Sequence, residues 1–129
     1  MATPYLNLTE LTAGEATPYV TVNALVRGVE AAVAGRITVD FPSDANYTLV
    51  ITAGSEEWKD KFMTITDSGT NLTAGRDVIF PAEEGPEYII KNSTAQTLTL
   101  KISGQTGVTI ATTNTGRFYY DGTDIVAAP

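Results

Sequence analysis

The sequence of 129 residues contains no histidine and no cysteine. Histidine is the commonest general base and metal ligand in proteins, and the cysteine thiolate is a frequent nucleophile. Chemistry that depends on these side chains is therefore excluded, and so is a disulfide scaffold. We expect a protein that is not an enzyme. The redox compartment stays open, because a chain without thiols tolerates either redox state.

Basic residues are also few, with eight Lys and Arg against 15 Asp and Glu, for a net charge of −7. The cations are scattered singly without a basic stripe, so nucleic-acid binding is not expected. No apolar run approaches the ~20 residues of a membrane span, and we expect no membrane insertion. The N-terminus lacks the features of a secretory signal, which predicts synthesis in a cytoplasm.

Carboxylates could still act in glycoside hydrolysis or bind Ca²⁺. The candidate acidic pairs lie in predicted polar loops and turns, where solvated carboxylates are the norm. The Ca²⁺ candidates do not have the spacing of an EF-hand loop. We therefore expect no cofactor and no metal. The residues considered for Ca²⁺ are Asp40, Asp44 and Asn46 in one turn, and Asp121 and Asp124 in another.

The composition favours a folded, β-rich protein. Hydrophobic residues make up 43% of the chain, and its length suits a single domain with one core. Threonine occurs 21 times, and its branched Cβ fits a pleated strand. Short alternating segments separated by turn residues recur about every ten residues. We predict strands near 36–41, 46–52, 61–66, 76–80, 87–92, 97–103, 108–111, 116–120 and 123–127.

This pattern predicts a mostly β fold, with an antiparallel β-sandwich or jelly-roll-like domain over residues 36–129. Parallel pairing is not expected, because the sequence offers no crossover helices between the strands. The pair Asp121-Gly122 predicts a hairpin. Phe62 and Ile65 are both expected in the core, and no repeat of fixed period is visible.

An amphipathic helix is predicted over residues 21–34, with Thr21 or Asn23 as N-cap and Gly35 as a left-handed C-terminal residue. About three turns are too short to be stable alone, so the helix needs a partner. It could cover the end of the β-domain or form a homo-oligomeric bundle. Its apolar stripe consists of Val22, Leu25, Val26, Val29 and Val33.

Residues 1–18 contain two prolines and read as an extended arm. Four large apolar side chains in this arm have no partner in local structure, so the arm is either disordered or packs on another surface, such as a neighbouring subunit. We predict that residues 1–35 serve attachment and oligomerisation. The apolar residues of the arm are Tyr5, Leu6, Leu8 and Leu11.

Trp58 lies in a polar segment that is predicted to be a loop. An exposed tryptophan could stack on a sugar and so contact a host surface glycan. Alternatively, Trp58 folds back and covers the edge of the sandwich, which is the interpretation that we favour.

Two parts of the chain are similar to known proteins. Residues 17–33, TPYVTVNALVRGVEAAV, resemble a segment near the N-terminus of structural proteins of tailed phages and gene-transfer agents. Residues 76–81, 87–94, 98–101, 107–110 and 120–123 resemble the β-modules of phage head-fibre, spike and tail-fibre proteins.

The resemblance implies a virion protein whose N-terminal segment attaches to the particle while its β-domain projects, usually as a homotrimer. The partners would be the major capsid protein or portal and tail proteins. The chain lacks the extended shaft and the collagen-like or coiled-coil heptads of a full fibre, so a capsid decoration protein or head spike fits it better. The alternative is a tail fibre or receptor-binding module that recognises host surface glycans.

Overall fold

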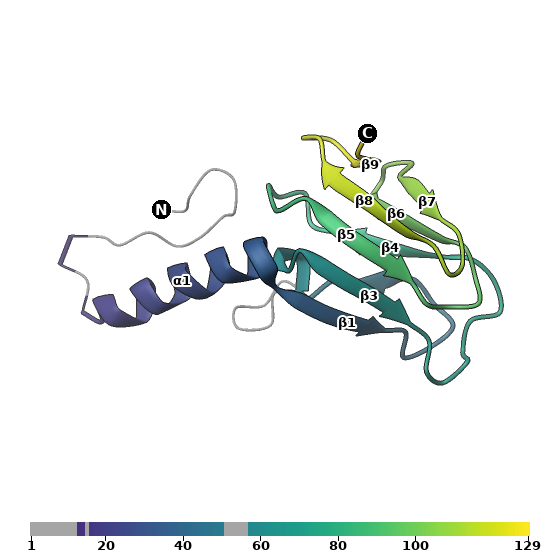
Figure 1. Ribbon diagram of the computed structural model, residues 1–129, viewed down its shortest axis with the longest axis horizontal. Coiled ribbons are helices and arrows are strands. Elements are labelled where there is room, and N and C mark those ends of the chain that lie inside the picture. Colours follow the sequence, from purple (N-terminus) through teal and green to yellow (C-terminus); the bar gives the residue numbers. More distant parts are fainter. Residues whose placement is uncertain (1–12, 15, 51–56) are drawn as a thin grey trace.

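The computed structural model describes residues 13–14, 16–50 and 57–129. These residues form one long helix that projects from a β-domain (Figure 1). The elements are α1 (Pro18–Ala34), β1 (Arg36–Asp40), β2 (Tyr47–Thr48), the 3₁₀-helix η1 (Glu57–Lys59), β3 (Phe62–Thr66), β4 (Arg76–Phe80), β5 (Tyr88–Asn92), β6 (Leu98–Ile102), β7 (Val108–Ile110), β8 (Thr115–Tyr120) and β9 (Ile125–Ala127). The fold is thus mostly β with one helix, and a strand lies at each of the nine predicted places.

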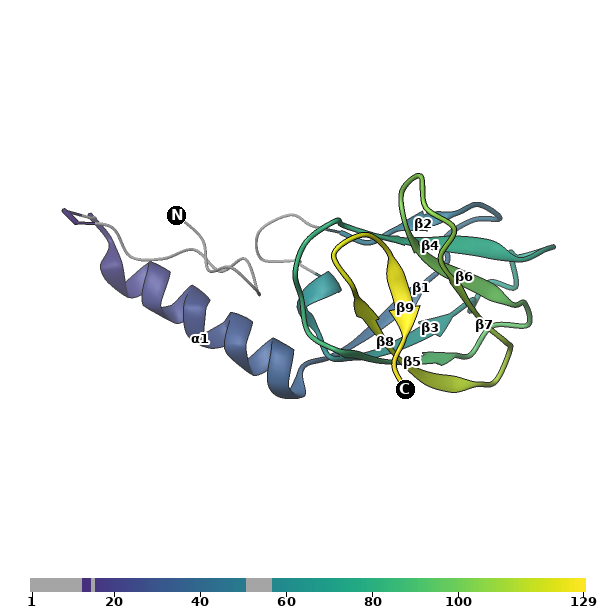
Figure 2. The ribbon, with the colours of Figure 1, turned by 90° about the horizontal axis from the view of Figure 1, so that it is seen from above.

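The strands form two sheets, and the core lies between them (Figure 2). One sheet has the order β1-β3-β5-β8-β9 and the other has the order β2-β4-β6-β7. Buried side chains alternate with more exposed ones along strands such as β3, β5 and β6, so each sheet buries one face. The buried apolar side chains run from Val39 in β1 to Ile125 in β9.

The predicted antiparallel pairing is wrong for the first six strands. β1, β3 and β5 pair parallel in one sheet, and β2, β4 and β6 pair parallel in the other. Between β1 and β6 the chain crosses to the opposite sheet after each strand, so every second strand of this part runs in the same direction. No crossover helix is needed, because a strand of the other sheet forms the connection.

The backbone thus winds from one sheet to the other in three turns, which consist of β1 and β2, β3 and β4, and β5 and β6. These turns differ in length. In the five-stranded sheet Arg36 pairs with Phe62, and Phe62 with Ile89, so successive turns are 26 and 27 residues long. In the other sheet Tyr47 pairs with Val78, and Val78 with Leu100, which gives 31 and 22 residues. A sequence period is therefore not visible, although the backbone is wound.

The last three strands close the C-terminal end with antiparallel pairs. β8 and β9 form the predicted hairpin, with residues 121–124 as its loop. Within that loop the Asp124 carboxylate accepts hydrogen bonds from the backbone N–H groups of Ile102 and Gly107 in the other sheet. The side chain of Asp124 thus ties the two sheets together.

Asn92 lies at the end of β5 and is completely buried. Its Nδ2 donates to the carbonyls of Gln96 and Ile110, at 2.8 and 3.0 Å. Its Oδ1 accepts from the backbone N–H of Thr94 at 2.9 Å and from the hydroxyl of Thr94 at 2.7 Å. The amide therefore joins the turn after β5 to β7, and every polar atom of the side chain is used.

Polar side chains also hold the turns of the winding together. Asp40 accepts hydrogen bonds from Thr66 and Ser68, and Asp44 accepts them from Thr73 and Arg76. Each of these carboxylates lies in the first turn, and each of its donors lies in the second.

The position of Phe62 differs from the prediction. β3 points Met63 and Ile65 into the core, with 1% and 0% of their surfaces exposed. Phe62 has the opposite parity and faces outward from the five-stranded sheet.

We predict that Asn92→Ala lowers the free energy of unfolding by about 3 kcal/mol, because four hydrogen bonds are lost and buried backbone groups lose their partners. Asn46→Ala is the matched control. Asn46 is exposed and accepts one bond from the N–H of Asp77, so it should cost about 1 kcal/mol. Chemical denaturation measures both values. Equal losses would contradict the role assigned to Asn92.

Several aspartates determine how the free energy of unfolding depends on pH under acidic conditions. Hydrogen bonds from the backbone N–H and hydroxyl of Ser68 and from the Thr66 hydroxyl lower the pKa of Asp40 below its ordinary value of 3.8, and bonds from Thr73 lower the pKa of Asp44. Backbone N–H groups lower the pKa of Asp121. Their ionised forms favour the folded state above the unfolded pKa, and this contribution is lost as the pH falls through the folded-state values. Burial raises the pKa of Asp60, which acts in the opposite direction.

We expect the free energy of unfolding to fall as the pH is lowered from about 5 to about 3. Asp44→Asn should flatten this dependence, because it removes one carboxylate with a lowered pKa. Asp60→Asn should steepen it, because it removes the opposing group. Urea unfolding at a series of pH values measures the slopes, and equal slopes in the two variants would refute the assignment.

Candidate functional site: the projecting helix

α1 begins at Pro18 and therefore extends one turn further toward the N-terminus than predicted. Proline is favoured in the first helical position, where its missing N–H has no partner to lose. The predicted N-caps Thr21 and Asn23 lie inside the helix. The actual N-cap is Thr17, whose side chain makes no capping hydrogen bond.

The junction between helix and β-domain is closely packed. The carbonyl of Ala31 accepts hydrogen bonds from the N–H groups of Gly35 and Lys61, and the carbonyl of Gly35 accepts one from Phe62. Gly35 is extended, with φ −62° and ψ 142°, so the predicted left-handed conformation is wrong. A Cβ at this position would lie 2.2 Å from Oδ1 of Asp60. Close approach, not a left-handed backbone, explains the glycine.

Beyond this junction α1 is largely free of the β-domain (Figure 1). Its main contact is with η1, and no residue of α1 is buried. Of the predicted interface residues, Val22, Val26, Val29 and Val33 are exposed, and Leu25 is half-buried. The structure therefore does not place the helix over the end of the core.

Five of the exposed apolar residues of α1 form a regular seam, which we define as Tyr19, Val22, Val26, Val29 and Val33. Their spacing alternates between three and four residues, which is the spacing of a and d positions in a coiled coil. Val26 is 52% exposed and Val33 is 66% exposed. The sequence prediction missed Tyr19, because the predicted helix began after it.

The helix has little intrinsic stability. Five of its 17 residues are valine and one is glycine, all of which are weaker helix formers than alanine or leucine. It has no acidic residue in the first turn and no basic residue in the last. An isolated helix of this length is marginal in water even with a better composition. Burial of the seam against a partner would stabilise it.

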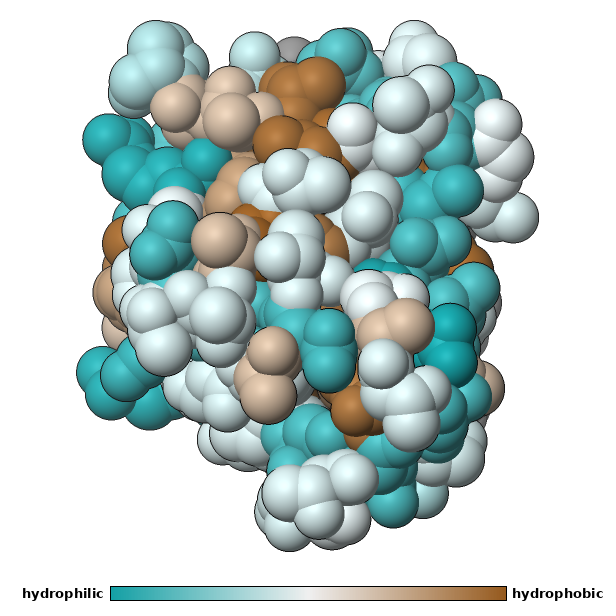
Figure 3. Space-filling view, turned by 90° about the vertical axis from the view of Figure 1, so that its right-hand side faces the viewer, coloured by the Kyte–Doolittle hydropathy of each residue, from teal (hydrophilic) through white to brown (hydrophobic). Residues whose placement is uncertain are grey.

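The other predicted interface residues, Tyr5, Leu6, Leu8 and Leu11, lie outside the described residues. The core of the β-domain does not depend on α1, because its buried residues lie between Val39 and Ile125. At the end opposite the helix, most of the surface is hydrophilic or weakly polar, and the apolar residues form small separate areas (Figure 3).

Trp58 folds back onto the domain, as the favoured interpretation predicted. It is 3% exposed, its carbonyl accepts a hydrogen bond from the Tyr88 hydroxyl, and Lys59 Nζ lies 5.3 Å from its ring centre. Burial raises the pKa of Tyr88. The indole is therefore not available to stack on a sugar in this structure.

Tyr47 lies near the same segment. Its hydroxyl donates to the carboxylate of Glu57 at 2.9 Å. Burial, together with this carboxylate, raises the pKa of Tyr47 to about 12. The phenol therefore stays protonated at neutral pH and fixes η1 to β2.

The residues considered for Ca²⁺ have other partners. The carboxylates of Asp40, Asp44, Asp121 and Asp124 accept hydrogen bonds from neighbouring donors. Among the described residues, no three acidic side chains gather as a metal site would need. No described helix has the length and apolar character to cross a membrane.

Comparison with known proteins gave no match to any family model, curated protein or solved structure.

The seam yields a direct prediction. Val26→Glu should weaken self-association, because it places a charge in the seam, whereas Val20→Glu should not. Both valines are 52% exposed, but Val20 lies on another side of α1. Light scattering of the purified chain gives the mass over a range of concentrations. Equal masses for the two variants would contradict association through the seam, and an unchanged melting temperature would show that the β-domain stays folded.

Proposed function

We propose that the protein is a structural component of a bacteriophage particle, a capsid decoration protein, head spike or fibre component. It is made in the host cytoplasm and ends up in the virion. The resemblance of residues 17–33 and of the C-terminal strands to phage structural proteins supports this proposal. The lack of histidine and cysteine supports a structural role over catalysis.

One observation carries the proposal: α1 presents an exposed apolar seam, while the β-domain has a core to which α1 adds no buried residue. Such a separation suits a protein that folds first and then attaches through its N-terminal part. Residues 1–35 would form the attachment segment and residues 36–129 the displayed domain. The partners would be the major capsid protein or portal and tail proteins.

The seam also favours a homotrimer. In coiled coils, β-branched residues at both a and d shift the preference from dimers to trimers or tetramers. Four of the five seam residues are valine. The β-domain would then face outward as a two-layered, sandwich-type module, and three copies would surround the helices.

Purified particles test this function. We expect the full-length chain, expressed in a host that produces the particles, to copurify with them in a fixed stoichiometry measured by mass spectrometry. A chain that begins at Arg36 should be absent from the particles and still unfold cooperatively, because its core is retained. Incorporation of the shortened chain at the same level would refute attachment through residues 1–35.

A further inference from the structure

The outer face of the five-stranded sheet carries an unusual group of side chains. Arg36 of β1, Phe62 of β3, Ile89 of β5 and Arg117 of β8 are register partners, so they form one row across four strands. We call them the outer row. The alternation of buried residues in β3 shows that this row faces away from the core.

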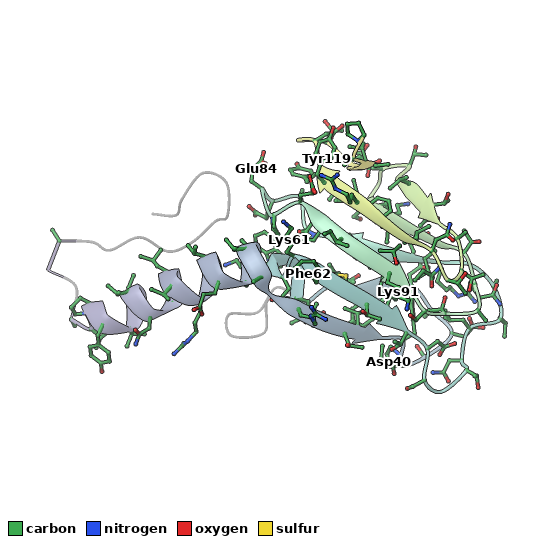
Figure 4. All side chains as sticks on the ribbon, viewed as in Figure 1. Asp40, Lys61, Phe62, Glu84, Lys91 and Tyr119 are labelled. Atoms are coloured by element: carbon green, nitrogen blue, oxygen red, sulfur yellow. The ribbon has the colours of Figure 1, made fainter. Side chains whose placement is uncertain are left out.

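Cations gather at this row. The guanidinium of Arg36 lies 5.6 Å from the ring centre of Phe62, and the ammonium of Lys61 lies 6.0 Å from it (Figure 4). Lys91 projects from the same sheet at an exposed position. With Arg117, four of the eight cationic residues of the chain lie on or beside this face, although the chain as a whole has a charge of −7.

Three of these cations lack a carboxylate partner in the described part of the chain. Ion pairs join Arg76 with Asp44, Lys101 with Asp77 and Arg117 with Glu87. Arg36 and Lys61 both lie within about 6 Å of the centre of one aromatic ring. A negative group placed near this ring would gain from both cations.

An acidic pair that could supply such a group lies at the same end of the β-domain. Glu83 and Glu84 are exposed in the loop between β4 and β5. The same loop packs onto η1. Gly85 lies so close to Trp58 that a Cβ at this position would be 3.3 Å from the indole ring. η1 in turn contacts α1. Figure 4 shows Glu84 at the edge of the domain, beside the face that carries Lys61 and Phe62.

We propose that the outer row, with Lys61, docks the Glu83–Glu84 loop of a second copy of this chain. The proposal rests on the oligomer of the proposed function and names the contact between its β-domains. Copies joined in parallel through the seam of α1 would bring the helix-proximal ends of their β-domains together. The helix-proximal end of each β-domain carries both the outer row and the Glu83–Glu84 loop.

Charge also fixes the kind of symmetry. If two outer rows faced each other, cations would oppose cations, and such an isologous contact would be unfavourable. A heterologous contact places the row of one copy against the acidic loop of the next, and such contacts form a ring when the rotation between copies closes. This arrangement agrees with the cyclic trimer that the seam favours.

Charge reversal on full-length chains tests the contact. One variant carries Arg36→Glu and Lys61→Glu, a second carries Glu83→Lys and Glu84→Lys, and a third carries all four substitutions. Light scattering at a series of concentrations gives the dissociation of each oligomer at low and high salt. Circular dichroism checks that each variant is folded.

We expect each one-sided variant to dissociate at about tenfold higher concentration than the unmodified chain, because like charges then face each other. The fourfold variant, which has the original net charge, should regain most of the lost association. Lys101→Glu is the control, because Lys101 lies on β6 in the other sheet. High salt should reduce the differences.

Two results would overturn the contact. One-sided variants that associate like the unmodified chain would show that the row and the loop do not form an interface. A fourfold variant that dissociates like the one-sided variants would show that the two groups do not meet each other. If either result is found and Val26→Glu still dissociates the oligomer, association through the seam is supported and only this contact is refuted. A chain that is monomeric at every concentration would overturn both the contact and the seam, and particle copurification would then decide attachment separately.

Discussion

The structure depends on one constraint, which is that each of the first six strands must bury one face against a strand of the opposite sheet. The chain meets this constraint by crossing between the sheets after each strand from β1 to β5. The parallel direction of the pairs follows from this winding, and the register places Val39 opposite Ile65 so that both point to the same interior. In the third turn the partner of Ile65 is Asn92, where a polar side chain would be costly if its bonds were not complete. Its four hydrogen bonds satisfy the amide and also anchor β7, so the winding ends where antiparallel closure begins.

Much of the local structure could be predicted from the sequence, because alternation and turn residues act over a few positions. All nine strands and the β8–β9 hairpin lie where these patterns placed them. The pairing could not be predicted, because a strand that is buried on one face has the same alternation in a parallel and an antiparallel neighbourhood. The turns of 26, 27, 31 and 22 residues also hide the winding from a search for repeats. The donors to Asp124 are likewise distant in sequence, and only the fold brings them together.

The apolar face of α1 could be predicted only in part, because periodicity is also a local pattern. Periodicity identified the apolar face of the helix, including Val22, Val26, Val29 and Val33, but it could not tell whether the face meets its own domain or another surface. The exposure of these residues shows that the face does not pack on the described part of its own domain, and it adds Tyr19 to the seam. The outer row could not be found from the sequence at all. Arg36, Phe62, Ile89 and Arg117 are separated by 26 to 28 residues, and only the register of the sheet aligns them. The alternation that puts Met63 inside also leaves Phe62 on the outer face, where two cations lie near its ring.

The separation between helix and β-domain has a thermodynamic consequence for assembly. Because α1 adds no buried residue, the two-sheet core can be stable in a monomer, and association through the seam costs no rearrangement of that core. In the proposed oligomer the helix would be the part that gains stability, since its own composition is unfavourable. Apolar burial in the seam would supply most of the affinity, whereas the charges of the outer row and of the Glu83–Glu84 loop would set the order in which copies sit beside one another. Affinity and arrangement would then be encoded in different parts of the chain, so a substitution in one need not disturb the other.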